Sequence, residues 1–135
     1  MITSKIDYLG GLRTSATHLA SGTTIITDAP VDNHGKGEAF SPTDLVATSY
    51  ASCMLTIIGI YCQSHNLQFT HGNAEVTKIM SSDSPRRIEK LIITLDISKN
   101  DWDETQTKHV IAAGKACPVA KTLGDNVVVE LNINA

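Results

Sequence analysis

The sequence predicts an α+β protein with a mainly antiparallel sheet, formed as one domain over residues 1–135. Three observations support this class. Short β-rich segments fill the first third of the chain, a long uncharged apolar segment follows, and further strand-like segments come after it, with two helix starts. A chain of 135 residues also suits a single core, because a domain of this size buries about two-thirds of the surface of its unfolded chain.

The first third of the chain predicts three strands and a loop. Residues 2–8 alternate crudely between apolar and polar side chains, a glycine pair then marks a turn, and residues 12–19 and 23–27 are rich in β-forming side chains. Residues 28–40 are polar and contain glycine, which predicts a loop. A loop of this length in a compact domain is often functional.

The strongest helix start in the chain is at Ser41. Ser41 can accept a hydrogen bond as the N-cap, Pro42 has no N–H to lose at the first helical position, and Asp44 opposes the positive end of the helix dipole. We expect this helix to end at about Ser64. Residues 45–62 are uncharged and apolar on most faces, which favours a helix buried in the centre of a domain over a membrane span.

The rest of the chain predicts two strands, two helices and a closing strand. These elements are expected at residues 74–80, 88–97, 101–114, 118–123 and 127–133. Asp101, with Glu104 three residues later, resembles a capping box that opens the first of the two helices. Pro118 lies at the first position of the second helix, and Gly124 is its expected stop.

Composition and charge argue against several classes of protein. The chain has 11 Lys and Arg against 14 Asp and Glu, a net charge of −3, and its pI near 5.9 argues against a nucleic-acid binder. Its start lacks the apolar core of a signal peptide, and three cysteines do not make a secreted disulfide framework. We therefore expect a cytoplasmic protein with reduced thiols and no membrane association.

The three cysteines are the candidate reactive groups. Cys53 and Cys62 lie on one predicted helix about 180° apart, so they cannot pair, and their spacing fits no common zinc site. Cys117 lies at a predicted N-cap, where backbone N–H groups favour a thiolate, although a small buried apolar residue would also fit there. Cys53 needs a nearby cation to become reactive and is otherwise a packing residue. Cys62 is expected to be a buried structural thiol, and the five histidines have no metal-ligand spacing.

Two motifs in this sequence resemble those of the OsmC/Ohr family, the osmotically inducible and organic hydroperoxide resistance proteins. They are SPTDLVATSYASCM at residues 41–54 and ACPVAKTL at residues 116–123, and GGLR at 10–13 and GKGEAFSP at 35–42 add to the match. The resemblance covers essentially the whole chain. It implies an intertwined homodimer, in which the sheet wraps around long central helices and two active sites lie at the interface.

The resemblance also implies roles for particular residues. Cys53 matches the peroxidatic cysteine of the family, Cys117 matches the resolving cysteine, and Arg13 matches the arginine that stabilises the thiolate. The implied function is a thiol-dependent peroxidase that reduces organic hydroperoxides in an oxidative stress response, through a Cys53 sulfenic acid that Cys117 resolves as a disulfide. It uses no metal and no organic cofactor, and a dithiol such as a lipoylated protein would reduce the disulfide.

One position departs from the family pattern. Organic hydroperoxide resistance proteins usually carry a Glu ten residues before the first cysteine, paired with the arginine, whereas Thr43 stands there in this chain. The carboxylate partner of Arg13 is then expected to be Glu38 or Asp44, with Glu38 favoured because Asp44 lies at a helix start. The departure keeps a second interpretation open: a non-catalytic or weakly catalytic dimer that senses redox state or binds a small hydrophobic ligand.

Overall fold

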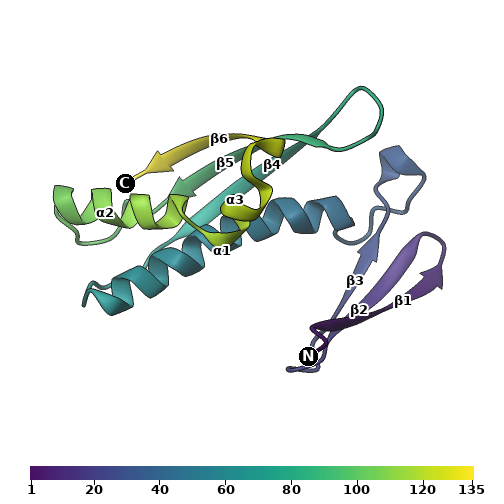
Figure 1. Ribbon diagram of the computed structural model, residues 1–135, viewed down its shortest axis with the longest axis horizontal. Helices are drawn as coiled ribbons and strands as arrows, with labels where there is room; N and C mark the ends of the chain where they lie inside the picture. Colours follow the sequence, from purple (N-terminus) through teal and green to yellow (C-terminus); the bar gives the residue numbers. More distant parts are fainter. The chain divides into compact units, whose positions relative to one another are not determined.

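The computed structural model describes residues 1–135 and confirms the α+β class. The chain divides into two compact units, Met1–Val46 and Ala47–Ala135. In Figure 1 the first unit is drawn in purple and blue and the second in teal, green and yellow.

The first unit is a three-stranded antiparallel sheet followed by a loop. Its strands are β1 (Ser4–Gly10), β2 (Arg13–His18) and β3 (Thr24–Asp28), and they lie in that order (Figure 1). The loop contains a short 3-10 helix, η1 (Val31–Asn33). The register of β2 and β3 pairs the first residue of β2 with the last residue of β3, Arg13 with Asp28.

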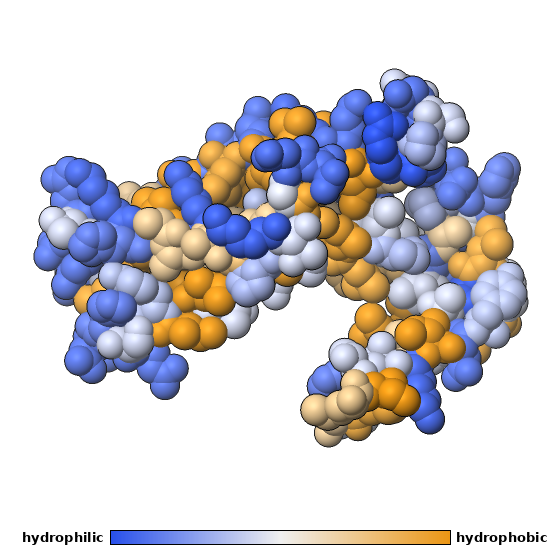
Figure 2. Space-filling view, viewed as in Figure 1, coloured by the Kyte–Doolittle hydropathy of each residue, from blue (hydrophilic) through white to orange (hydrophobic).

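One face of this sheet is apolar and exposed. Across the three strands Ile6 pairs with Ala16, and Ala16 pairs with Ile25, so these side chains share a face. Ile6 is 60% exposed and Ile25 44% exposed, and no apolar side chain between residues 1 and 46 is buried. Figure 2 shows such apolar surface in orange. The sheet therefore presents an apolar face without forming an apolar core of its own.

The second unit combines a sheet with helices. Its strands β4 (Asn73–Met80), β5 (Ile88–Asp96) and β6 (Val128–Asn134) lie in that order (Figure 1). The helices are α1 (Pro42–Ser64), which belongs to this unit from Ala47 onward, α2 (Glu104–Lys115) and α3 (Pro118–Leu123), which is followed by the 3-10 helix η2 (Gly124–Asn126).

The predicted antiparallel pairing holds for three of the four strand pairs. The exception is β5 with β6, which is parallel. The chain between these two strands passes through α2 and α3, and a crossover of this kind brings the next strand back in the same direction. The strands also form two separate sheets.

The core of the second unit lies between β5 and α1. Alternate side chains of β5 are fully buried, namely Leu91, Ile93 and Leu95. The buried residues of α1 follow helical spacing and form one stripe: Ala47, Ala51, Met54, Ile58 and Cys62. In the single chain α1 is buried along this stripe, and Ile60 and the other residues outside the stripe are exposed or only partly buried. By length and composition alone, α1 would also be able to cross a membrane.

The start of α2 differs from the prediction by two residues. Asp103, rather than Asp101, is the N-cap: its side chain accepts a hydrogen bond from the Gln106 N–H at 2.8 Å, and the Gln106 side chain accepts one from the Asp103 N–H at 2.9 Å. Both aspartates have a possible capping-box partner three residues later, Glu104 for Asp101 and Gln106 for Asp103. Trp102 lies between them, and its indole N–H donates to the Gln68 carbonyl at 2.8 Å, which holds this residue outside the helix.

Candidate functional site: a thiol pair and an arginine cluster

Two cysteines far apart in the sequence meet in the second unit. Cys53 lies on α1 and is partly buried, whereas Cys117 lies between α2 and α3 and is fully buried. The side chains of Cys53 and Cys117 are hydrogen-bonded to each other, and both thiols are free. Their surroundings are apolar, because Cys117 belongs to the same buried cluster as Met54, Ile58 and Val110.

Local backbone geometry fixes the position of Cys117. Its N–H donates to the Gly114 carbonyl at 3.3 Å, which closes the turn after α2. The residue then caps α3, as predicted: its Sγ accepts the Ala120 N–H at 3.4 Å, and Pro118 occupies the first turn. The turn between α2 and α3 thus directs this thiol back into the core.

The pKa of the Cys117 thiol is raised above its ordinary value. Burial is the largest cause, because it disfavours the charged thiolate. The Ala120 N–H lowers the pKa, but the hydrogen bond and the charge interaction with Cys53 raise it again. The expectation that the N-cap would favour a thiolate is therefore overturned by burial, and Cys117 is a protonated thiol at neutral pH.

Tyr50 is a further polar group beside this thiol pair. It lies three residues before Cys53 on α1, and the pKa of its hydroxyl is raised by burial and then by the charge of Cys117. Sequence reasoning did not single out Tyr50. The signal for it was the spacing to Cys53, since residues three apart are neighbours on a helix surface.

The third cysteine, Cys62, is part of the core. It is buried in the stripe of α1 that faces the sheet, and burial raises the pKa of its thiol. No group of three or more His, Cys, Asp or Glu side chains is arranged to hold a metal ion.

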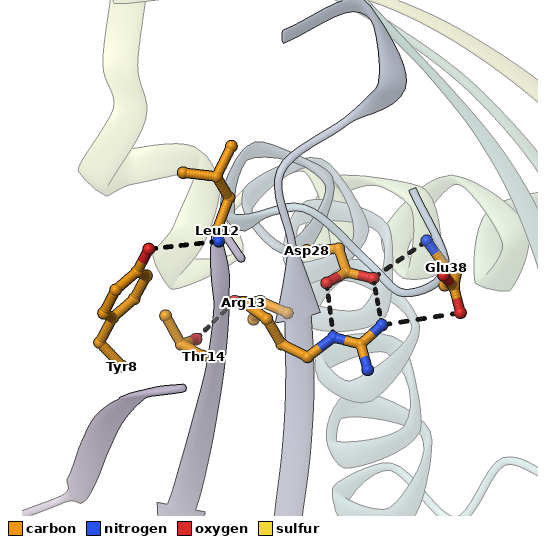
Figure 3. A network of polar contacts seen from close by, with 7 residues as sticks. Tyr8, Leu12, Arg13, Thr14, Asp28 and Glu38 are labelled. Atoms are coloured by element: carbon orange, nitrogen blue, oxygen red, sulfur yellow. Dashed lines mark hydrogen bonds and ion pairs between the residues drawn. The ribbon is translucent and has the colours of Figure 1, made fainter. Parts of the chain in front are cut away.

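Arg13 is the centre of a polar cluster in the first unit (Figure 3). Its Nε and Nη2 donate to the two carboxylate oxygens of Asp28 at 2.8 and 2.9 Å. The Asp28 side chain is fully buried, and it also accepts the Glu38 backbone N–H at 3.0 Å. The Glu38 carboxylate lies 3.7 Å from Arg13 Nη2 and is 66% exposed.

The principal carboxylate partner of Arg13 is thus Asp28, which sequence reasoning missed. Glu38 is near Arg13, as expected, but at a longer distance. Asp44 acts at the start of α1 instead, where its carboxylate accepts the Ser41 N–H at 3.0 Å and its own N–H donates to the Ser41 hydroxyl at 3.0 Å. Asp28 was assigned to the loop, and only the register of β2 with β3 brings it opposite Arg13.

The ion pair between Arg13 and Asp28 shifts the pKa values of its two members in opposite directions. The hydrogen bonds from Arg13 lower the pKa of the Asp28 carboxyl, and those to Asp28 raise the pKa of the guanidinium. Both groups are therefore charged throughout the physiological range. A permanent cation held at a fixed place can stabilise a thiolate or bind peroxide oxygens.

Comparison with known proteins agrees with this fold. The family model described as OsmC-like protein matches residues 35–132, a range that includes both members of the thiol pair. A Staphylococcus aureus (strain MSSA476) protein named organic hydroperoxide resistance protein-like is 28% identical over 112 residues, which cover 82% of this chain and 77% of that protein.

Solved structures of related proteins share the fold of this chain. A candidate osmotic stress induced and detoxification response protein from Psychrobacter arcticus 273-4 is 48% identical, with a TM-score of 0.91, and the match covers 99% of this chain and 96% of that one. The organic hydroperoxide resistance protein OhrB of Bacillus subtilis shares the fold at 20% identity, with a TM-score of 0.67 and 98% coverage of both chains.

The fold and the thiol pair place the protein in the class of α+β proteins that carry two cysteines on adjoining helices. The family match over most of the chain makes the assignment specific: this chain belongs to the OsmC-like protein family. Its relatives include proteins named for organic hydroperoxide resistance.

Proposed function

We propose that this protein, as a single OsmC-like domain over residues 1–135, is a cysteine-based peroxidase that reduces organic hydroperoxides. The observation that carries the proposal is the hydrogen-bonded pair of free thiols, Cys53 and Cys117, with different burial. A two-cysteine peroxidase needs one thiol that the substrate can reach and a second thiol, shielded from the substrate, within reach of the first.

In the first step, the Cys53 thiolate attacks the terminal oxygen of the hydroperoxide. A sulfur–oxygen bond forms, the oxygen–oxygen bond breaks, and the alkoxide leaves and takes up a proton to become the alcohol. Cys53 is oxidised to a sulfenic acid by two electrons. The partial exposure of Cys53 on α1 supports this role, since the buried Cys117 is less accessible.

In the second step, the Cys117 sulfur attacks the sulfenic sulfur. A disulfide forms, and the hydroxyl leaves as water with the proton of the Cys117 thiol. Because a charged Cys53 raises the pKa of Cys117, conversion of Cys53 to the neutral sulfenic acid removes that effect. Cys117 thus becomes easier to deprotonate after Cys53 has reacted. A dithiol, for example that of a lipoylated protein, then supplies two electrons and two protons to restore both thiols.

Arg13 is the proposed cation for the Cys53 thiolate, with Glu38 as a nearby carboxylate. The guanidinium stays charged at any working pH, and it can donate hydrogen bonds to peroxide oxygens as well. Replacing Arg13 with Ala should therefore slow the alkylation of Cys53 at neutral pH.

The surroundings of the thiol pair favour an organic substrate over hydrogen peroxide. Met54 and Ile58 are buried in the same cluster as Cys117, and Cys53 and Ile57 pack against it. An apolar group next to the peroxide would contact such side chains, and hydrogen peroxide has no such group. Comparable rates with cumene hydroperoxide and hydrogen peroxide would contradict this preference.

We also propose that the protein is a cytoplasmic homodimer. The first unit carries exposed apolar side chains such as Ile6 and Ile25 on one sheet face, and it has no buried apolar residue. A second copy of the chain would cover such apolar surface, which monomeric proteins seldom expose in quantity. Sedimentation equilibrium of the purified protein gives the oligomeric state directly, and a monomer at micromolar concentration would reject the dimer.

A count of free thiols tests the proposed chemistry. The reduced protein has three free thiols. One equivalent of an organic hydroperoxide should reduce the count to one, and peptide mapping should identify a disulfide between Cys53 and Cys117. An unchanged count would instead favour the second interpretation, a redox-sensing or ligand-binding dimer, for which thermal stabilisation by a small apolar ligand without peroxide consumption is the expected result.

A further inference from the structure

The hydrogen bonds of the Arg13 guanidinium all go to one carboxylate, that of Asp28. Its Nε and Nη2 donate to the two oxygens of the Asp28 carboxylate, and Nη1 makes no hydrogen bond (Figure 3). A carboxylate that accepts hydrogen bonds from both Nε and Nη2 fixes the rotation and the plane of the guanidinium. The two N–H groups of Nη1 are thereby left in a defined direction.

Asp28 is itself fixed from several sides. It ends β3 directly opposite Arg13 in the sheet, and its own N–H donates to the Phe40 carbonyl at 3.1 Å. Its carboxylate also accepts the Glu38 N–H, and the side chain is fully buried. The carboxylate therefore connects the arginine to both the sheet and the loop after β3, and it cannot move independently of either.

Glu38 does not have these properties. Its carboxylate is 3.7 Å from the guanidinium and mostly exposed, and exposed ion pairs of this kind contribute little and orient their partners weakly. Two carboxylates thus lie beside Arg13, but only Asp28 makes the geometry that determines its direction.

We infer that Asp28 is the positioning residue for Arg13, and that it fixes the guanidinium so that the N–H groups of Nη1 stay available to the anion of the reaction. The inference rests on the proposed peroxidase function for that last step. In this role Asp28 contacts neither the substrate nor the thiol, and it acts only through Arg13.

The effect of Asp28→Asn on the reaction rate distinguishes a positioning role of Asp28 from a purely electrostatic one. If only charge mattered, Asp28→Asn would speed the reaction, because it removes a negative charge next to the cation that stabilises the thiolate. If Asp28 positions Arg13, the same substitution slows the reaction, because an amide offers one acceptor oxygen and presents its own N–H groups to the guanidinium. We expect kcat/KM for cumene hydroperoxide to fall about 10- to 100-fold.

A double-mutant cycle shows whether Asp28 acts through Arg13. Asp28→Asn should lower kcat/KM in the natural protein but by less than about twofold when Arg13 is already Ala, because the group it positions is gone. A purely structural role would give equal losses in both backgrounds and would overturn the inference. Glu38→Gln should cost less than Asp28→Asn, and Asp83→Asn, which removes a similar pair with Arg87 on the exposed β4–β5 hairpin, should leave the rate unchanged.

A measurement on Arg13 itself does not depend on activity. Arg13 donates through Nε to the Asp28 carboxylate at 2.8 Å, so its Nε–H should give a slowly exchanging ¹⁵N-edited NMR signal, which Arg13→Lys assigns by removing it. The signal should persist in Glu38→Gln and disappear in Asp28→Asn. A rapidly exchanging Arg13 Nε–H in the natural protein would overturn the inference without any variant. If the natural protein consumes no hydroperoxide, the proposed function fails, while this signal still decides whether Asp28 positions Arg13.

Discussion

The thiol of Cys117 is hydrogen-bonded to that of Cys53, and a charge on Cys53 raises the pKa of Cys117. The two residues come from different elements, the middle of α1 and the N-cap of α3. The hydrogen bond and the charge interaction both disfavour the Cys117 thiolate, so Cys117 keeps its proton. The relationship therefore distinguishes the two thiols and predicts different consequences for their removal.

Replacing each thiol in turn should separate the two steps of the reaction. Cys53→Ser should abolish turnover of organic hydroperoxides, because no other accessible thiol lies beside Cys117. Cys117→Ser should allow one rapid event and then stop, with Cys53 trapped as a sulfenic acid that dimedone labels. Stopped-flow peroxide consumption and intact mass measure both outcomes, and steady turnover in the Cys53 variant would reject the assignment.

The rate of disulfide formation should rise with pH. Because burial raises the pKa of Cys117, it is mostly a thiol at neutral pH, and its thiolate fraction grows about tenfold per pH unit below that pKa. Rapid quenching after one equivalent of hydroperoxide, followed by mass spectrometry, gives the rate of the second step. A rate that does not vary between pH 6 and 9 would contradict a thiolate nucleophile with a raised pKa.

Cys62 provides the matched control for both cysteine variants. Its thiol is buried against the sheet and its pKa is raised by burial, so it should react with iodoacetamide much more slowly than Cys53 in the folded protein. Cys62→Ala should leave the peroxidase rate unchanged, and it should lower the free energy of unfolding by about 1 kcal/mol through the small cavity it creates. Loss of activity in a folded Cys62→Ala protein would implicate this third thiol.

The elements that local signals determine were predicted best. The bounds of α1, Pro42 and Ser64, agree with the prediction, because Ser41 and Asp44 form the capping interactions that their spacing indicates. The start of α3 was predicted for the same reason. By contrast, Asp101 and Asp103 both had a capping partner, and the choice between them depended on contacts of the intervening Trp102 with a distant segment.

The parts of the site that depend on distant contacts could not be predicted from residue patterns. The meeting of Cys53 with Cys117 follows from the packing of the α2–α3 turn on α1, and only the family resemblance pointed to it. Asp28 was missed because strand register, which no local motif specifies here, brings it opposite Arg13. The raised pKa of Cys117 was missed because burial, rather than the N-cap position, decides it.

The ion pair of Arg13 with Asp28 should make the stability of the protein sensitive to acid. The pKa of Asp28 is lowered in the folded state, so its contribution to stability is complete above the unfolded pKa of about 3.9 and is lost as the pH falls through the folded value. Asp28→Asn should therefore lower stability at pH 7 and flatten its decline in acid, as measured by urea unfolding between pH 2.5 and 7.

Asp83 provides the control for this measurement, because Arg87 also lowers its pKa but both side chains are largely exposed. Asp83→Asn should change stability much less than Asp28→Asn at any pH, since solvent screens an exposed pair. Equal effects of the two substitutions would mean that the burial of Asp28 adds nothing to its pairing with Arg13. A larger and pH-dependent effect at Asp28 alone is the outcome that its burial, its bidentate contact and its hydrogen bond to the Glu38 N–H predict.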